Sequence, residues 1–179
     1  ADVYYSKEPK KTKEIVKADQ FSGVDDKNMS ELVNATFDDI DIYQNVADLS
    51  GKGFLLPFSK GALTSYKFFL TDSTMLDGEW CYKLEFTPRR KQDLCFTGHA
   101  WIHDETAAIK AIELQLLNQT NLNYVSVLKI KQGFVFHKRK QWFKNKEQME
   151  VKLNITRKEK HQSIRILKTS SRRNIRVNE

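Results

Sequence analysis

The stretch DGEWCYKLEFTPRRKQDLCFTGHAWIHDETAAIKAIELQLL, residues 77–117, decides the fold of this chain. Apolar and charged side chains alternate over residues 82–86, which is typical of a strand with one buried side. A polar loop separates this segment from a second predicted strand at residues 94–102, and a turn at Asp104 leads to a third at residues 112–116. Three strands joined in this way predict an antiparallel meander, which is a scaffold and indicates no chemistry by itself.

The same alternation continues on both sides of the meander. It predicts further strands at residues 1–5, 63–70, 128–136, 148–156 and 164–168. Apolar residues at helical spacing predict a helix over residues 29–38, and the glycines and proline of residues 51–61 predict a loop. The predicted fold is mainly β, of the α+β class: one curled antiparallel sheet of seven or more meander strands, with one or two short helices on one face. Residues 1–168 form the predicted single domain, and residues 169–179 a basic tail or linker.

The composition fits a chain that folds around its own core. The chain has 179 residues, of which 40% are hydrophobic, and a domain of this size buries about 70% of its unfolded surface. No apolar run approaches the roughly 20 residues that a membrane helix needs. Because the sequence starts at Ala1 without an export leader and both ends are polar, we expect it to be a piece of a longer protein.

The two cysteines give little information about the redox compartment. If Phe86 pairs near Leu94 across the polar loop, Cys95 lies opposite Glu85, and Cys81 lies roughly 13 Å farther along its strand. A disulfide does not span that separation, so two free thiols are expected.

Basic residues are concentrated at the end of the chain. Residues 138–179 contain 14 Lys and Arg against four Asp and Glu, a local charge of +10, whereas the remaining residues carry −3. One interpretation is a surface for phosphates, lipid headgroups or a protein partner. The other is the solvated face of two strands followed by a tail, in which Lys152, Arg157 and Arg165 are ordinary outward residues.

No sequence motif indicates catalysis or metal binding. The chain lacks GxSxG, HExxH, CxxC and P-loop patterns. His99 and His103 would share a strand face but lie roughly 13 Å apart, which is too far for one metal ion to bridge. Asp104 and Glu105 fit a turn better than an acid–base pair. We therefore predict a noncatalytic domain with no catalytic residues, no cofactor and no metal ligands.

One set of apolar side chains is in phase for a single face of the sheet, and we predict this set as the apolar binding face. Its members are Tyr82, Leu84, Phe86, Phe96, Ile112, Leu114, Phe134 and Phe136. Two interpretations stay open. A partly open face would bind a lipid or another hydrophobic ligand, whereas a covered face would be the core beneath the helix.

A nucleic-acid-binding module is the alternative function. Aromatic and basic residues mix over residues 134–144, and exposed aromatic rings beside a basic groove can stack on bases. This function requires Phe134, Trp142 and Phe143 to face solvent next to the lysines. A nucleic-acid partner is not the expectation that we adopt.

The chain also resembles a known family over residues 1 to about 167. The meander carries the pattern Tyr82-x-Leu84-x-Phe86-x-Pro88-Arg89, then Asp93-Leu94-x-Phe96-x-Gly98-x-x-Trp101-Ile102-x-Asp104-x-Thr106-x-Ala108-Ile109. Shorter motifs keep the same order: KEIVKA with FSG at residues 13–23, DIYQN at 41–45, YKFFL at 66–70 and NLNYV at 121–125. These motifs resemble an uncharacterised domain of Bacteroidetes outer-membrane proteins, which follows a carboxypeptidase-like regulatory domain and precedes a C-terminal membrane barrel.

The resemblance implies a periplasmic domain associated with the outer membrane, as part of a longer protein, and it supplies no catalytic residues. In that setting the domain would be a spacer beside the barrel or would bind a hydrophobic ligand. A curled sheet with a short helix on one face is also similar to lipoprotein carriers of the LolA type. The residues Arg172, Arg173 and Arg176 are then candidates for a juxtamembrane segment that meets anionic headgroups.

Overall fold

The computed structural model describes residues 2–6, 11–15, 40–49, 51–116, 125–137, 141–157 and 160–172. The chain divides into two compact units, Ala1–Asp39 and Ile40–Glu179, and each is described by itself. In the first unit, β1 (Asp2–Ser6) pairs antiparallel with β2 (Lys11–Ile15). The helix predicted over residues 29–38 lies outside the described residues.

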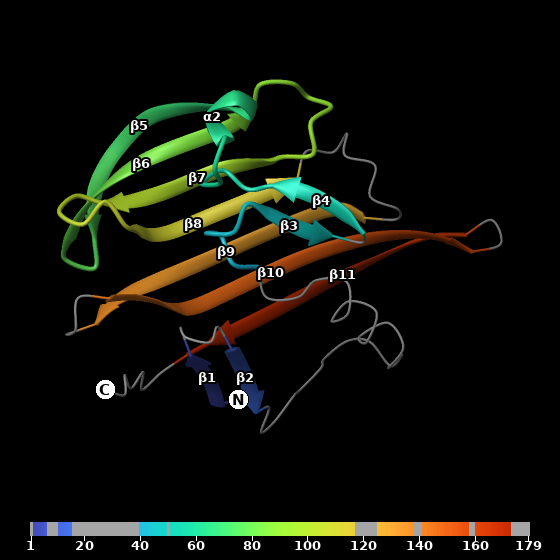
Figure 1. Ribbon diagram of the computed structural model, residues 1–179. Helices are drawn as coiled ribbons and strands as arrows, with labels where there is room; N and C mark the ends of the chain where they lie inside the picture. Colours follow the sequence, from blue (N-terminus) through green and yellow to red (C-terminus); the bar gives the residue numbers. More distant parts are fainter. Residues whose placement is uncertain are drawn as a thin grey trace. The chain divides into compact units, whose positions relative to one another are not determined.

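The second unit is built on one antiparallel sheet of seven strands, which lie side by side in chain order (Figure 1). They are β5 (Tyr66–Leu76), β6 (Glu79–Pro88), β7 (Phe96–His103), β8 (Ile109–Leu116), β9 (Val125–His137), β10 (Gln141–Arg157) and β11 (Lys160–Ser171). A separate hairpin contains β3 (Val46–Leu49) and β4 (Lys52–Leu55), and the single turn α2 (Ala62–Ser65) precedes β5. The predicted class, a mainly β fold with one open antiparallel sheet, is confirmed.

Two local predictions are wrong. The predicted loop at residues 51–61 contains β4, because its residues find hydrogen-bonding partners in β3, with Val46 opposite Leu55. The strand predicted from Leu63 begins only at Tyr66. The three residues before it belong to α2, where the Thr64 amide and hydroxyl both donate to the carbonyl oxygen of Gly61 and close a helical turn.

The predicted pairing of the first two meander strands is also wrong in register. Phe86 pairs with Gly98 and not near Leu94, because residues 89–95 form a longer loop. Glu85 therefore lies opposite His99 and not opposite Cys95. Both cysteines of the chain are buried and free.

The strand β11 continues past the predicted start of the tail. Thr169, Ser170 and Ser171 pair with Gln148, Glu147 and Lys146 of β10. Backbone pairing of this kind satisfies the amide and carbonyl groups of these three residues. The residues from position 173 onward lie outside the part of the chain that the structure describes.

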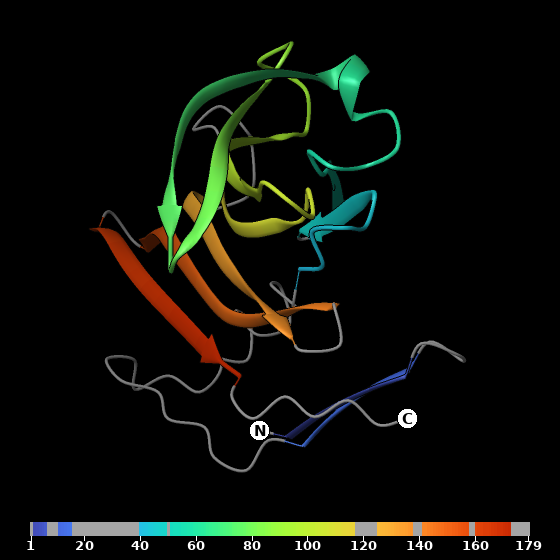
Figure 2. The same cartoon turned by 90° about the vertical axis from the view of Figure 1, so that its left-hand side faces the viewer.

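The sheet curls because its strands are bent at several irregular positions. The register shifts at Leu70/Asp72, Trp101/Ile102, Lys144/Lys146 and Lys152/Leu153. An extra residue in one strand bends that strand and increases its twist. Figure 2 shows the resulting sheet curling around β3 and β4. We call the side of the sheet that faces this hairpin the inner face, and the opposite side the outer face.

The core lies between the inner face and a covering segment, which we define as residues 40–49 and 51–65. The ring of Phe54 lies 5.8 Å from that of Phe96, and the ring of Phe58 lies 6.1 Å from that of Phe86. The covering segment contributes the buried side chains Ile40, Ile42, Ala47, Leu49, Phe54, Leu56 and Ala62. Burial of large apolar side chains on both sides supplies the main favourable term for this arrangement.

The hydroxyl of Tyr66 connects the covering segment to the sheet. It donates to the carbonyl oxygen of Leu55 at 2.5 Å and accepts from the amide of Phe96 at 2.9 Å. Burial is the main cause that raises the pKa of this hydroxyl, which therefore stays protonated and able to donate at any physiological pH.

The strands β7 and β8 approach each other closely at Gly98. A Cβ atom added there would lie 1.9 Å from the carbonyl oxygen of Glu113. Only glycine fits this position without moving the backbone of β8.

We expect Tyr66→Phe to lower the free energy of unfolding by about 1–3 kcal/mol, because it leaves the buried Phe96 amide and Leu55 carbonyl without their partner. Urea unfolding followed by circular dichroism measures the change. The matched control is Tyr82→Phe, which removes the hydroxyl of an exposed tyrosine and should change stability by less than about 0.5 kcal/mol. Equal effects of the two substitutions would contradict the bridging role.

We expect Gly98→Ala to destabilise the fold by more than about 3 kcal/mol, since β7 and β8 must separate to accommodate the methyl group. Gly133→Ala is the control, because an added Cβ at that strand position meets its nearest atom at an ordinary 3.4 Å. Thermal unfolding of both variants gives the comparison. A Gly98→Ala protein as stable as Gly133→Ala would show that the close approach is absent.

Candidate apolar binding face

The strand register places the eight residues of the predicted apolar face on the inner face of the sheet. Cross-strand neighbours share a face, and Leu84 pairs with Ala100, which in turn pairs with Ile112. Leu114 pairs with Ile130, from which Phe134 and Phe136 follow at even spacing along β9. The eight residues therefore share the inner face, but they differ in exposure.

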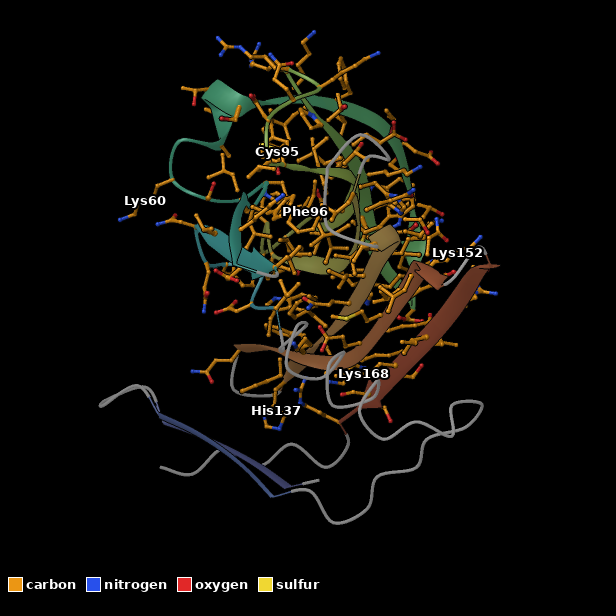
Figure 3. All side chains as sticks on the ribbon, turned by 90° about the vertical axis from the view of Figure 1, so that its right-hand side faces the viewer. Lys60, Cys95, Phe96, His137, Lys152 and Lys168 are labelled. Atoms are coloured by element: carbon orange, nitrogen blue, oxygen red, sulfur yellow. The ribbon has the colours of Figure 1, made fainter. Side chains whose placement is uncertain are left out.

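The centre of the inner face is covered by protein. The residues Phe86, Phe96, Ile112, Leu114 and Phe134 are buried. Figure 3 shows the labelled Phe96 in the interior, whereas Lys60 of the covering segment points outward. These five members of the predicted binding face are core residues in contact with, or enclosed by, the rest of the domain.

An uncovered part of the inner face remains at the β5 border. Tyr82 is exposed and Leu84 is half-buried. Three nearby residues on the same face are also exposed. Trp80, two residues before Tyr82 on β6, lies opposite Met75, and Leu70 lies opposite Leu84. We call the exposed residues Leu70, Met75, Trp80 and Tyr82 the open strip. The sequence pattern missed its β5 members because the extra residue at the β5 bulge breaks the alternation between Leu70 and Met75.

Phe136 lies apart from the open strip, at the end of β9. Its exposed ring lies 5.3 Å from the ring of Trp142, which is itself 5.3 Å from the ring of His103. The indole N–H of Trp142 donates to the hydroxyl of Thr106 at 3.1 Å. Because Trp142 is half-buried and Phe134 is buried, nothing in this arrangement favours the base-stacking platform of the nucleic-acid alternative.

A buried polar cluster holds the start of the covering segment against the sheet. The side-chain amide of Gln132 donates to the carbonyl oxygen of Ile40 at 2.7 Å and to a carboxylate oxygen of Glu147 at 2.6 Å. The ammonium of Lys144 lies 3.4 Å from the other carboxylate oxygen of Glu147. Hydrogen bonds to a charged group in a buried position are strong, so this cluster fixes where residue 40 enters the core.

A second polar cluster lies at the β5–β6 turn. The turn residues Asp77 and Gly78 both have positive φ, at 50° and 83°, which suits a tight two-residue hairpin. The buried ammonium of Lys110 pairs with the carboxylate of Glu79 and lies 3.8 Å from that of Asp77. Burial raises the pKa of the neighbouring Cys81 thiol, and the charge of Lys110 opposes this only in part, so the thiol is not an activated nucleophile.

The outer face carries a row of charged side chains across four strands. Glu85, His99, Glu113 and Lys131 follow one another as cross-strand neighbours. Burial, followed by the charge of Lys83, lowers the pKa of His99 in spite of the two carboxylates beside it. His103 is not part of this row, because it lies opposite Cys81 of β6. Its Nδ1 lies 3.0 Å from the Thr106 hydroxyl. Among the described residues, no three His, Cys, Asp or Glu side chains gather as metal ligands.

The chain matches a family of unknown function, DUF5686, over residues 2–167. The chain belongs to this family. No curated protein and no solved structure matches it. The family description states no activity, so membership in DUF5686 leaves the role of the domain to be argued from its own residues.

The basic residues at the end of this DUF5686 domain are only partly described. Arg172 is half-buried, and its amide donates to the carbonyl oxygen of Asn145 at 2.7 Å. Arg173 and Arg176 lie outside the described residues. Lys152 and Arg165 are exposed, and Arg165 pairs with Glu150 at 2.8 Å. None of the helices among the described residues has both the length and the apolar character that crossing a bilayer requires.

The outer charged row predicts a pH dependence of stability. Partial burial raises the pKa of Glu113, but the hydrogen bond and charge of Lys131 outweigh it, and the net pKa lies below the usual 4.5. A carboxylate with a lowered pKa in the folded state stabilises the fold above its unfolded pKa and loses this contribution as the pH falls through its folded pKa. Stability from this pair is therefore present at pH 7 and is lost as the pH falls below about 4.

We expect Lys131→Met to lower the thermal unfolding midpoint at pH 7 and to differ less from the unmodified protein at about pH 3, because protonation of Glu113 at acidic pH removes the charge that Lys131 pairs with. Differential scanning calorimetry at the two pH values measures the difference. Lys91→Met, in the exposed β6–β7 loop, is the charge-matched control and should behave alike at both pH values. A Lys131→Met difference that stays constant with pH would rule out this pairing.

Proposed function

We propose that this chain is a noncatalytic periplasmic domain of an outer-membrane protein and that it binds an acyl chain or a similar hydrophobic ligand along the open strip. The observation that carries the binding proposal is the open strip itself: four large apolar side chains at the β5–β6 border stay exposed beside the covered centre of the inner face. Exposed apolar side chains that form one patch mark binding sites more often than single exposed residues do.

The chemistry of the open strip favours an aliphatic ligand. Its side chains are two aromatic rings, one thioether and one leucine, and Trp80 is 43% exposed. Aromatic side chains offer large apolar area with a polar edge that stays in water, and Met adapts its shape to flexible ligands. The strip extends roughly 13 Å, from the Trp80–Met75 pair to Leu70, which lies opposite Leu84 four residues farther along β6.

The proposed location follows from the resemblance to domains that stand beside an outer-membrane barrel. The resemblance covers the motifs of the meander, such as the segment that contains Trp101 and Asp104. Fractionation of cells that produce the full protein tests this location. The domain should become accessible to protease only after the outer membrane is opened, and accessibility in intact cells would place it elsewhere.

The absence of catalysis is proposed from the state of the candidate groups. Burial raises the pKa of both the Cys81 and the Cys95 thiols, which disfavours the reactive thiolate. His103 pairs with a threonine hydroxyl and an aromatic ring, and the ring of His137 lies edge-on to Phe143 at 5.9 Å. A general base that activates a hydroxyl is itself oriented by a third group, and among the described residues no carboxylate is bonded to the ring of His103.

A second candidate function is that of a spacer without a ligand. The burial of Phe86 and Phe96 beneath Phe58 and Phe54 favours it, because the centre of the inner face is occupied by the chain itself. In this function the open strip would contact another part of the longer protein, and free acyl chains would not bind.

We expect Trp80→Asp to weaken binding of lauric and palmitic acid at least tenfold, because a carboxylate then replaces the largest apolar surface of the open strip. Isothermal titration calorimetry with the 179-residue chain measures the affinity. The control is Leu63→Asp, at an exposed apolar residue of α2 outside the open strip, which should bind as the unmodified protein does. If the unmodified protein binds neither acid, the acyl-binding proposal is overturned and the spacer function is favoured.

A further inference from the structure

The strand β5 forms one border of the seven-stranded sheet, and its outward edge has no partner among the described strands. Among the described strands it pairs with β6 alone (Figure 1). It is 11 residues long, contains no proline or glycine, and exposes Phe69 by 51% and Leu70 by 68%. Free amide and carbonyl groups along such an edge are a template for another strand, and the side chains of β5 determine which strand fits.

The side chains of β5 alternate between the two faces, with one interruption. Lys67, Phe69 and Asp72 lie opposite Thr87, Glu85 and Lys83 of β6, so all three belong to the outer face. Phe68 and Leu70 lie opposite Phe86 and Leu84 and belong to the inner face. Thr71 has no opposite residue, because the register advances from Leu70 directly to Asp72. The ladder therefore runs as if Thr71 were absent.

Thr71 has no partner in the ladder to β6, and a second copy that keeps side chains on matching faces must pass over it in the same way. Under that condition β5 is complementary to itself in the antiparallel direction. A two-fold axis at Phe69 places the two Phe69 rings opposite each other on the outer face. The same axis places Lys67 of each copy opposite Asp72 of the other, which gives two opposite-charge pairs. On the inner face, Phe68 then lies opposite Leu70 of the second copy.

Other registers that keep side chains on matching faces lose both charge pairs. Moving the second strand by two ladder positions in one direction places Lys67 opposite Phe69. Moving it by two positions in the other direction places Lys67 opposite Thr74 and Asp72 opposite Phe69. Direct cross-strand pairs of opposite charge are favourable, so the charges specify one register.

We propose that two copies of this chain form a homodimer by antiparallel pairing of β5 with β5, centred on Phe69, with Lys67 and Asp72 as reciprocal ion pairs. The interface is isologous, since one surface meets the same surface of the second copy. In the dimer, β5 of each copy is paired on both sides, so neither sheet keeps a free edge at β5. The covered centre of the inner face is unchanged. This inference does not depend on the proposed ligand, because the backbone edge and the outer-face charges specify the pairing. The interface shares one residue, Leu70, with the open strip.

Charge reversal tests the register directly. Sedimentation velocity of the 179-residue chain over a range of concentrations should show a dimer. Lys67→Asp alone and Asp72→Lys alone should each give monomers, because each places two like-charge pairs in the interface. A mixture of the two single variants should restore a dimer. In that heterodimer, one pair places the new carboxylate at position 67 opposite the new ammonium at position 72. The other pair is the unmodified Lys67 and Asp72. The double variant Lys67→Asp/Asp72→Lys should also form a homodimer.

Controls separate the interface from folding. Lys91→Asp and Asp104→Lys make the same charge changes in exposed loops and should leave the dimer intact. Circular dichroism confirms that each variant is folded. A monomeric unmodified protein, or a dimer that persists in both single variants, overturns the proposal. Failure of the two single variants to associate on mixing, with both folded, also overturns it.

Covalent trapping gives an independent test of the axis. Residues directly opposite in an antiparallel pair have Cα atoms about 4.5–5.5 Å apart, within the range that a disulfide accepts. Phe69→Cys should therefore form a disulfide-linked dimer under mild oxidation, which non-reducing electrophoresis detects. Leu63→Cys, at an exposed position outside β5, should not. Equal crosslinking of both variants would show random collision and not the proposed pairing.

Discussion

The hydroxyl of Tyr66 is the contact on which the arrangement of the second unit depends. It joins the end of β4 to the start of β7 through two hydrogen bonds, at a point where the aromatic rings of Phe54, Phe86 and Phe96 meet. Burying a backbone amide or carbonyl without a hydrogen-bond partner costs free energy of folding. The hydroxyl of Tyr66 supplies a partner for one amide and one carbonyl, and it therefore has a large influence on stability. It fixes the covering segment against a sheet that would otherwise expose its whole inner face.

The covered core determines what the inner face can do. The covering segment occupies the centre of the inner face, where Phe54 and Phe58 fill the space that a ligand would need. The polar cluster of Gln132 and Glu147 holds Ile40, the first residue of this segment, in place. On the inner face, exposed apolar side chains remain at the border formed by β5 and β6 and, apart from it, at Phe136. The exposed apolar side chains and the free strand edge therefore occur in the same two strands, and Leu70 belongs to both.

The bulges connect the curl of the sheet to the pattern of its surfaces. Each extra residue bends a strand around the covering segment and also reverses the faces of all residues that follow. In β5, the extra Thr71 keeps Asp72 on the same outer face as Lys67. The same irregularity that shapes the sheet thus sets the charge pattern of its edge.

The sequence by itself determined the class of the fold and the common face of the eight apolar residues, because any half-buried strand imposes alternation with period 2. Residues 82–86, 112–116 and 148–156 show it clearly, and each lies within a strand of the structure. Only the tertiary structure decided which part of that face is covered. Burial of Phe86 and exposure of Trp80 depend on where the covering segment packs, and Gly53 in β4 gives no local signal of the partner strand β3. These features arise from contacts between distant residues, which local alternation does not encode.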